Sequence, residues 1–139
     1  VAGDCSGYVS IYAEKSNVDL YDMVVKENSI SGIILLDGTF ANAKRLEVHH
    51  NSQGFILDSY STLTIREVNI HDNTGIGIGI QRFSVLNCSD PASTVKDNGG
   101  APVALFISSA TAWCQASMSR SGNGNNNAPD LRDSFCLWH

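Results

Sequence analysis

The chain has 139 residues, a formal net charge of −5 and a hydrophobic content of 42%, which suits a single domain with a packed core and argues against disorder. The acidic balance, without a dense stripe of Lys and Arg, disfavours a nucleic-acid partner. No apolar run approaches the roughly 18–20 residues of a membrane span. Twelve Gly against three Pro, together with many Asn, indicate a turn-rich β architecture.

Short strands recur along the chain. Apolar residues alternate at a step of two, which is typical of a strand with one buried face. In chain order the predicted strands contain Val18 and Leu20, Leu46 and Val48, Leu63 and Ile65, Val68 and Ile70, and Leu86 and Cys88. An aliphatic residue also stands three positions before a polar one five times, as Val25–Asn28, Val48–Asn51, Ile70–Asn73, Val95–Asn98 and Met118–Ser121. The polar residues are spaced by 23, 22, 25 and 23 positions.

This period predicts stacked coils. One coil of three short strands cannot bury its own inner face, whereas stacking successive coils buries a continuous core. Asn side chains in register can hydrogen-bond along the stack at about 4.8 Å per coil, and Asn tolerates the left-handed conformation of a sharp corner. A leucine-rich repeat, an antiparallel sandwich and an α/β sheet each lack their own signatures here.

The motif V-x-x-N-x-x-G-[IF], as in Val48 to Phe55, resembles the right-handed parallel β-helix superfamily with the pectin-lyase-like fold. The resemblance covers about residues 7–121. It implies an all-β, right-handed parallel β-helix of about five coils, preceded by an N-terminal segment at 1–6 and followed by an irregular C-terminal cap at 122–139. Members include polysaccharide lyases, polygalacturonases, uronate epimerases, phage tailspikes and adhesins, so the resemblance implies a carbohydrate-related role.

The catalytic motifs of that superfamily do not carry over. The chain has no NTD, paired DD, GHG or RIK motif, and Asp90-Pro91 is followed by Ala92 where epimerases have His. No catalytic residue is assigned, enzymatic activity stays open, and no cofactor is expected.

Outward residues on adjacent coils predict a polar patch. Glu47, His49, Asn69 and His71 should lie together, with Arg66 at the neighbouring corner. A carboxylate, an Arg and His residues with a pKa near neutrality suit a carbohydrate-binding or acid–base site. The alternative is a solvated face whose side chains stack without a function. His49 and His71 lack a third ligand, so no metal site is expected.

Aromatic residues and cysteines leave further alternatives open. Phe40, Tyr60, Trp113 and Trp138 offer faces for sugar stacking, or cover the edge of the core. The four cysteines, Cys5, Cys88, Cys114 and Cys136, allow three pairings and favour an oxidising compartment, with buried free thiols as the alternative. Cys88 is expected to face inward, and Cys5 to align with the Asn column, 23 positions before Asn28.

The ends of the coil stack raise a further question. Few residues precede the first coil, so the N-terminal end is expected to be covered by a missing part of a longer protein or by another subunit. The sequence therefore predicts an extracellular or cell-surface β-helix module that contacts polysaccharide. The alternative is a structural subunit of a fibre, adhesin or tailspike that self-associates through uncapped coil ends. A fragment of a polysaccharide lyase or uronate epimerase, with Arg66 and His71 as neighbours of the substrate, is the third interpretation.

Overall fold

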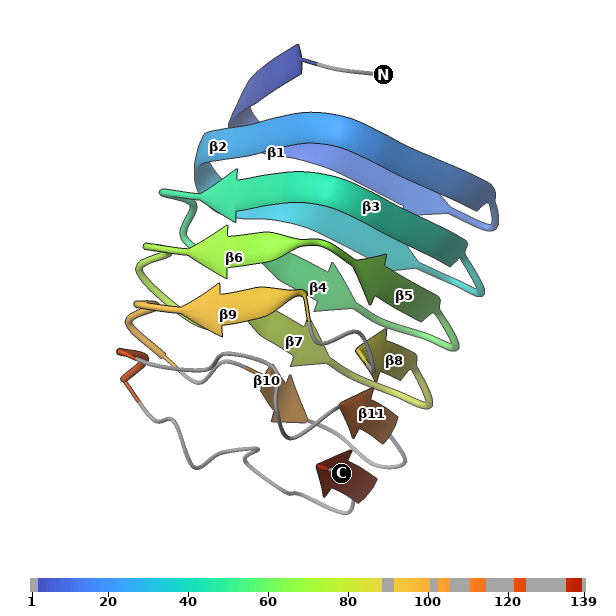
Figure 1. The fold of residues 1–139 in the computed structure, drawn as a ribbon. Helices are drawn as coiled ribbons and strands as arrows, with labels where there is room; N and C mark the ends of the chain where they lie inside the picture. Colours follow the sequence, from blue (N-terminus) through green and yellow to red (C-terminus); the bar gives the residue numbers. More distant parts are fainter. Residues whose placement is uncertain are drawn as a thin grey trace.

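The computed structural model describes residues 3–88, 92–100, 103–105, 111–114, 122–124 and 135–138. All regular elements in these residues are strands, which wind into a solenoid (Figure 1). In chain order they are β1 (Gly3–Glu14), β2 (Asn17–Leu36), β3 (Phe40–His49), β4 (Phe55–Leu57), β5 (Thr62–Arg66), β6 (Asn69–His71), β7 (Ile78–Ile80), β8 (Val85–Cys88), β9 (Thr94–Lys96), β10 (Val103–Leu105), β11 (Thr111–Cys114) and β12 (Phe135–Trp138). Among these residues, no helix is long and apolar enough to cross a membrane.

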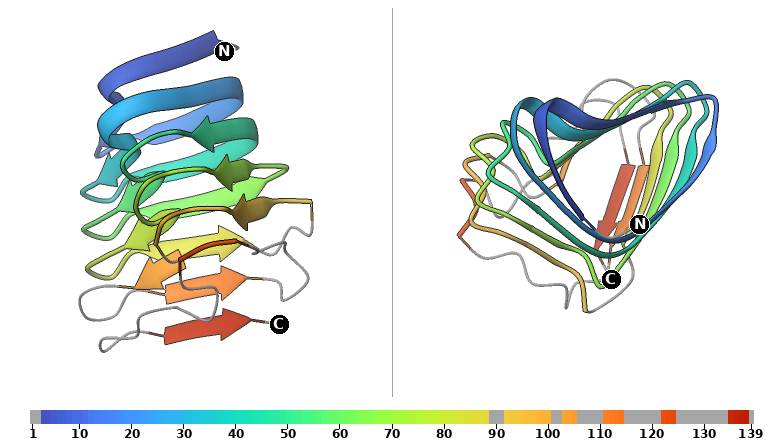
Figure 2. Two further views of the ribbon diagram at one scale, coloured as in Figure 1. Left: turned by 90° about the vertical axis from the view of Figure 1, so that its left-hand side faces the viewer. Right: turned by 90° about the horizontal axis from the view of Figure 1, so that it is seen from above.

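Successive turns of the solenoid stack in parallel around a common axis (Figure 2). One column of paired residues runs through Asn17, Phe40, Thr62, Val85 and Thr111. These positions delimit four complete turns of 23, 22, 23 and 26 residues. The predicted parallel β-helix is therefore confirmed, with about four turns in place of five. β1 and β12 add strands at the two ends, the latter within the segment expected to be an irregular cap.

The core is built from the predicted inward columns. Alternation at a step of two places Val25, Val48, Ile70 and Val95 one above another, and all four are fully buried. Phe55 is the largest of the fully buried side chains. Inward residues from every turn share one cluster, so that no single turn forms the core alone.

An asparagine ladder runs along one corner of the solenoid. The side-chain amide of Asn28 donates to Asn51 at 2.7 Å, Asn51 to Asn73 at 3.0 Å, and Asn73 to Asn98 at 2.8 Å. Each backbone N–H also donates to the amide oxygen of the next Asn. The ladder therefore satisfies buried polar groups between the turns, because every amide bonds to its neighbour.

Both ends of the ladder differ from the prediction. Asn98 donates to Asn123 at 2.8 Å, so Asn123 is the next ladder residue; Ser121 lies outside the described residues. At the other end, Cys5 pairs with Val25, and Gly7 pairs with Asn28, because the register of β1 shifts between Cys5 and Gly7. Ser10 donates its hydroxyl to Asn28 at 3.0 Å.

At the ladder corner, a residue other than Asn adopts the left-handed conformation. The residue before each Asn adopts it, with φ of 60° at Glu27, 53° at His50, 50° at Asp72 and 53° at Asp97. These four side chains are exposed, whereas the Asn side chains are buried. The expectation that Asn itself occupies the left-handed corner is therefore wrong, because the preceding residue makes the turn and leaves Asn facing inward.

Candidate functional site

Two outer faces of the solenoid meet at a corner. One face carries the first halves of β2 and β3 together with β5, and the other carries the second half of β3 with β6 and β9. The corner residues Asp22, Arg45 and Glu67 have φ between 52° and 55°. Arg45 Nη2 donates to Asp22 Oδ2 at 2.8 Å, which ties neighbouring turns together at this corner.

The second face carries the predicted polar patch, here called the histidine face and defined by Glu47, His49, Asn69 and His71. Strand pairing brings Glu47 beside Asn69 and His49 beside His71. The rings of His49 and His71 are stacked, with centroids 5.0 Å apart and planes within 6°. Glu47 Oε1 lies 2.9 Å from Nε2 of His71. The register of the parallel strands therefore assembles these four side chains, as the spacing predicts.

His71 is held between two carboxylates. Its Nδ1 lies 2.7 Å from Asp72 Oδ2, while Nε2 faces Glu47. Carboxylates accept hydrogen bonds, so both contacts are satisfied when both ring nitrogens carry protons. Burial of the ring opposes this charge, but the hydrogen bonds to Asp72 and Glu47 outweigh burial and raise the pKa of His71. The same contact with His71 lowers the pKa of Asp72.

The pKa of His49 is shifted in the opposite direction. Burial, opposed by Glu47 and reinforced by the nearby His71 and His50, lowers the pKa of His49. Its Nδ1 lies 2.6 Å from Nδ1 of His50, a distance that suits one N–H donor and one lone-pair acceptor. The stacked rings therefore have different proton affinities, and as the pH falls His71 is protonated before His49.

This difference predicts a pH-dependent contribution to stability. Because the folded pKa of His71 is above the ordinary histidine value of 6.5, its contribution is present below pH 6.5 and is lost as the pH rises through the folded pKa. We expect the unfolding free energy of wild type to exceed that of His71→Gln. This difference is expected to be larger at about pH 5.5 than at about pH 8. Urea denaturation at both pH values measures this, with Lys15→Gln, between β1 and β2, as the control. An equal difference at the two pH values would contradict the assignment.

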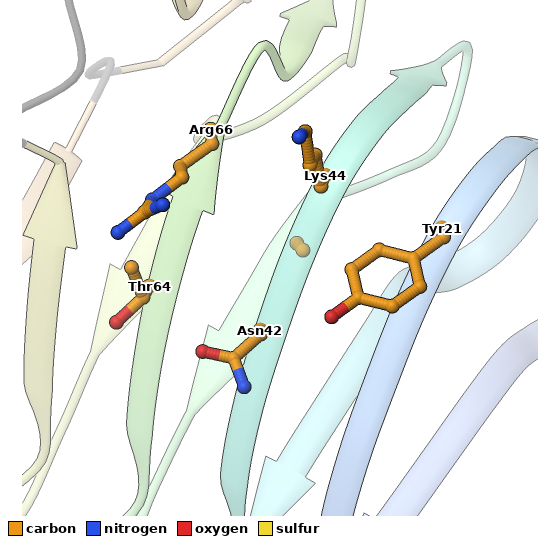
Figure 3. Close-up of a pocket in the computed structure, with 6 residues that line it drawn as sticks. Tyr21, Asn42, Lys44, Thr64 and Arg66 are labelled. Atoms are coloured by element: carbon orange, nitrogen blue, oxygen red, sulfur yellow. The ribbon is translucent and has the colours of Figure 1, made fainter.

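The first face carries a pocket of about 200 Å³ (Figure 3). Tyr21 on β2 and Arg66 on β5 lie on either side of β3. The pocket is lined by Tyr21, Asn42, Ala43, Lys44, Thr64 and Arg66. Five of these residues occupy alternating outward positions of three neighbouring strands, so the strand register places them on the same face.

Lys44 and Arg66 give the pocket positive charge, although the whole chain has a formal net charge of −5. Lys44 Nζ is 4.0 Å from Glu67 Oε1, a long and exposed contact. Within the described part of the chain, no residue forms a hydrogen bond or ion pair with the exposed guanidinium of Arg66. Arg66 therefore keeps its donors for a ligand, and its planar fork matches a carboxylate or sulfate group.

Arg66 and the histidine face lie on different sides of one corner. Arg66 ends β5, Glu67 makes the corner, and Asn69 begins β6. The predicted neighbours are thus adjacent, but Arg66 opens onto the pocket. Sequence reasoning did not assign Tyr21, Asn42 or Thr64 to a site, although their outward positions follow from the same alternation. No group of three or more His, Cys, Asp or Glu residues in the described ranges is arranged to hold a metal ion.

Comparison with known proteins gives one match. The family model for the right-handed β-helix region matches residues 2–121. No curated protein and no solved structure matches the chain significantly. The family match covers most of the chain and agrees with the parallel stacking of its strands. The chain belongs to the right-handed β-helix family.

Proposed function

We propose that this β-helix module binds polysaccharide, and that its ligand carries acidic groups. The observation that carries the proposal is the exposed guanidinium of Arg66, which has no partner among the described residues and lines the same pocket as Tyr21. A sugar carboxylate or sulfate would accept two parallel hydrogen bonds from Arg66. Tyr21 would stack against the ring, and Asn42 and Thr64 would bond its hydroxyl groups.

The histidine face extends the same surface across the corner. Glu47 and Asn69 offer polar groups to sugar hydroxyls, and His71 adds positive charge as the pH falls. We assign Glu47, His49, Asn69 and His71 to the outer part of the glycan contact and Arg66 to its anchor. The pH dependence of the charge implies that acidic glycans bind more tightly below the raised pKa of His71 than above it.

Arg66→Ala is expected to weaken binding to acidic glycans on a glycan array. Loss of a bidentate, charge-assisted contact lowers affinity by about tenfold to a hundredfold. Arg45→Ala is the matched control, because Arg45 is also an arginine near the same corner but pairs with Asp22. A wild-type protein that binds no glycan, or Arg66→Ala with an unchanged array profile, would overturn the proposal.

A structural role is the second candidate, and the edge of β1 favours it. β1 spans Gly3–Glu14, and within the described residues it pairs only with β2. Its other edge is therefore open to a further strand, and Tyr8 and Tyr12 on it are 78% and 60% exposed. Concentration-dependent assembly in sedimentation velocity, blocked by Tyr12→Lys, would support this role. A monomer at every concentration would remove it.

We further propose an extracellular or cell-surface location and a Cys88–Cys114 disulfide. The backbones of Cys88 and Cys114 are in-register neighbours on parallel strands. Such neighbours are about 4.8 Å apart, within the Cα separation that a disulfide requires. Cys136 pairs instead with Ala112, and Cys5 lies on β1 at the opposite end of the stack. Peptide mapping by mass spectrometry without reductant is expected to find Cys88 linked to Cys114; two unlinked thiols would contradict the proposal.

A further inference from the structure

Two neighbouring turns of the solenoid carry an exposed pair of aromatic rings. Tyr60 and Phe83 are stacked, with centroids 5.0 Å apart and planes within 6°. They are 65% and 47% exposed. Both adopt the left-handed conformation, with φ of 66° and 61°, and so do the preceding Ser59 and Arg82. We call these four residues the aromatic turn.

The conformation of the aromatic turn is unfavourable for such residues. A left-handed backbone brings the Cβ atom close to the following carbonyl oxygen, so bulky side chains rarely occupy it. The equivalent position one turn earlier is Gly38, with φ of 78°. Bulky rings kept at this position, mainly in solvent, are an outlier of the kind that points to a function.

Gly38 leaves one face of the Tyr60 ring open. Gly38 N donates to Ser59 O at 2.8 Å, and Tyr60 N donates to Arg82 O at 3.0 Å, so Gly38, Tyr60 and Phe83 occupy one column. A Cβ atom placed on Gly38 would meet no atom within 4 Å. Phe83 stacks on one face of Tyr60, and Gly38, on the opposite side of Tyr60 in this column, has no side chain to stack on the ring. A flat ring can therefore stack on Tyr60 and continue the column.

Polar groups of both signs lie near the aromatic turn. Arg82 Nε donates to Asp58 Oδ1 at 2.6 Å, and a second bond joins its Nη2 to Asp58 Oδ2. Asp58 is largely buried and holds Arg82 in place, which leaves three of the five guanidinium N–H groups for a ligand. The exposed carboxylate of Asp37, next to Gly38, supplies acceptors. A ring with several hydroxyl groups and no net charge matches this combination.

The aromatic turn is continuous with the pocket. β5 begins two residues after Tyr60 and ends at Arg66. Phe40, 58% exposed, begins β3 and pairs with Thr62, and Asn42 is the next outward residue of β3. The four residue-to-residue steps of extended strand from Thr62 to Arg66 span about 13 Å. A glycan of several rings can therefore contact the aromatic turn and the pocket together.

We propose that the aromatic turn is a subsite for a neutral sugar ring, at the far end of an extended glycan site that begins at Arg66. The inference rests on the proposed function, because it assigns the same ligand class to a second contact. It also requires a ligand long enough to reach both contacts. A ligand must place an acidic residue at Arg66 and a neutral ring on Tyr60, so a chain of alternating acidic and neutral sugars fits better than a single unit.

Titration with two probes tests the subsite. The probes are a disaccharide and a hexasaccharide of alternating glucuronate and glucose. Wild type is expected to bind the hexasaccharide about tenfold more tightly than the disaccharide, the gain that ring stacking supplies. Tyr60→Ala is expected to lose that gain and to keep its affinity for the disaccharide. Tyr60→Phe, which retains the ring, is expected to keep the gain.

Two further variants control the comparison. Gly38→Asn tolerates the left-handed conformation and places a side chain in the open space, so it is expected to weaken only the hexasaccharide. Tyr12→Ala removes an exposed tyrosine on β1 and is expected to change neither affinity. If Arg66→Ala lowers the affinity for both probes and Tyr60→Ala lowers the affinity for neither, this inference is overturned and the proposed function stands. If wild type binds neither probe, both are overturned.

Discussion

Asn73→Ala is expected to lower the free energy of unfolding by about 3–5 kcal/mol. Asn73 donates to Asn98 at 2.8 Å and to the carbonyl of Val48 at 3.2 Å. It accepts from both the backbone and the side chain of Asn51 at 3.0 Å. Alanine leaves these partners buried without a hydrogen bond, and each unsatisfied group costs about 1–3 kcal/mol.

Asn42→Ala is the matched control for the ladder. Asn42 is exposed and donates to Asp19 at 3.0 Å on the surface. Water replaces that bond, so the expected loss is about 0.5 kcal/mol. Urea denaturation of both variants gives the comparison. Similar losses for Asn73→Ala and Asn42→Ala would show that the ladder contributes no more than a surface contact.

Gly54→Ala is expected to lower the free energy of unfolding by about 3 kcal/mol. A Cβ atom at Gly54 would collide with the carbonyl oxygen of Gly77 in the next turn and would lie 3.0 Å from Ile70 Cγ2. The adjacent bonds, Gly54 N to Ile76 O at 3.1 Å and Phe55 N to Gly77 O at 2.9 Å, hold the two turns at this distance. The turns must separate to admit the methyl group, which strains bonds that stack the solenoid.

Gly38→Asn separates this steric effect from loss of glycine flexibility. Gly38 has a positive φ but open space around it, so Asn is expected to cost less than about 1 kcal/mol. Thermal unfolding of both variants gives the comparison. Replacing Gly by Ala at an unstrained position is stabilising by about 0.4–1 kcal/mol. Unchanged or increased stability of Gly54→Ala would therefore contradict the close approach of the two turns.

The inner columns of the solenoid could be predicted because burial imposes a strict pattern on sequence. Val25, Val48, Ile70 and Val95 alternate with outward residues and recur once per turn, and each is fully buried. The ends of the ladder could not be predicted, since they depend on local register. A shift in β1 moves Cys5 away from Asn28, and Asn123 lies in a run rich in Asn and Gly where spacing alone does not select one residue.

The candidate site also has one part that could be predicted from the sequence and one part that could not. The grouping of Glu47, His49, Asn69 and His71 follows from register and could be predicted. The pocket depends on side-chain directions at Tyr21 and Arg66, which the spacing does not determine. The stacking of Tyr60 on Phe83 could not be predicted either, because it depends on consecutive left-handed residues at each turn that align these two rings.

Titration of wild type, Arg66→Ala and Arg45→Ala with an oligogalacturonate, at low and at high salt, tests the proposed glycan site most directly. Wild type and Arg45→Ala are expected to bind with equal affinity, which falls as salt screens the charge on the ligand. Arg66→Ala is expected to bind about tenfold to a hundredfold more weakly. Equal affinity of wild type and Arg66→Ala, or no binding by wild type, would contradict the assignment of this pocket to an acidic polysaccharide.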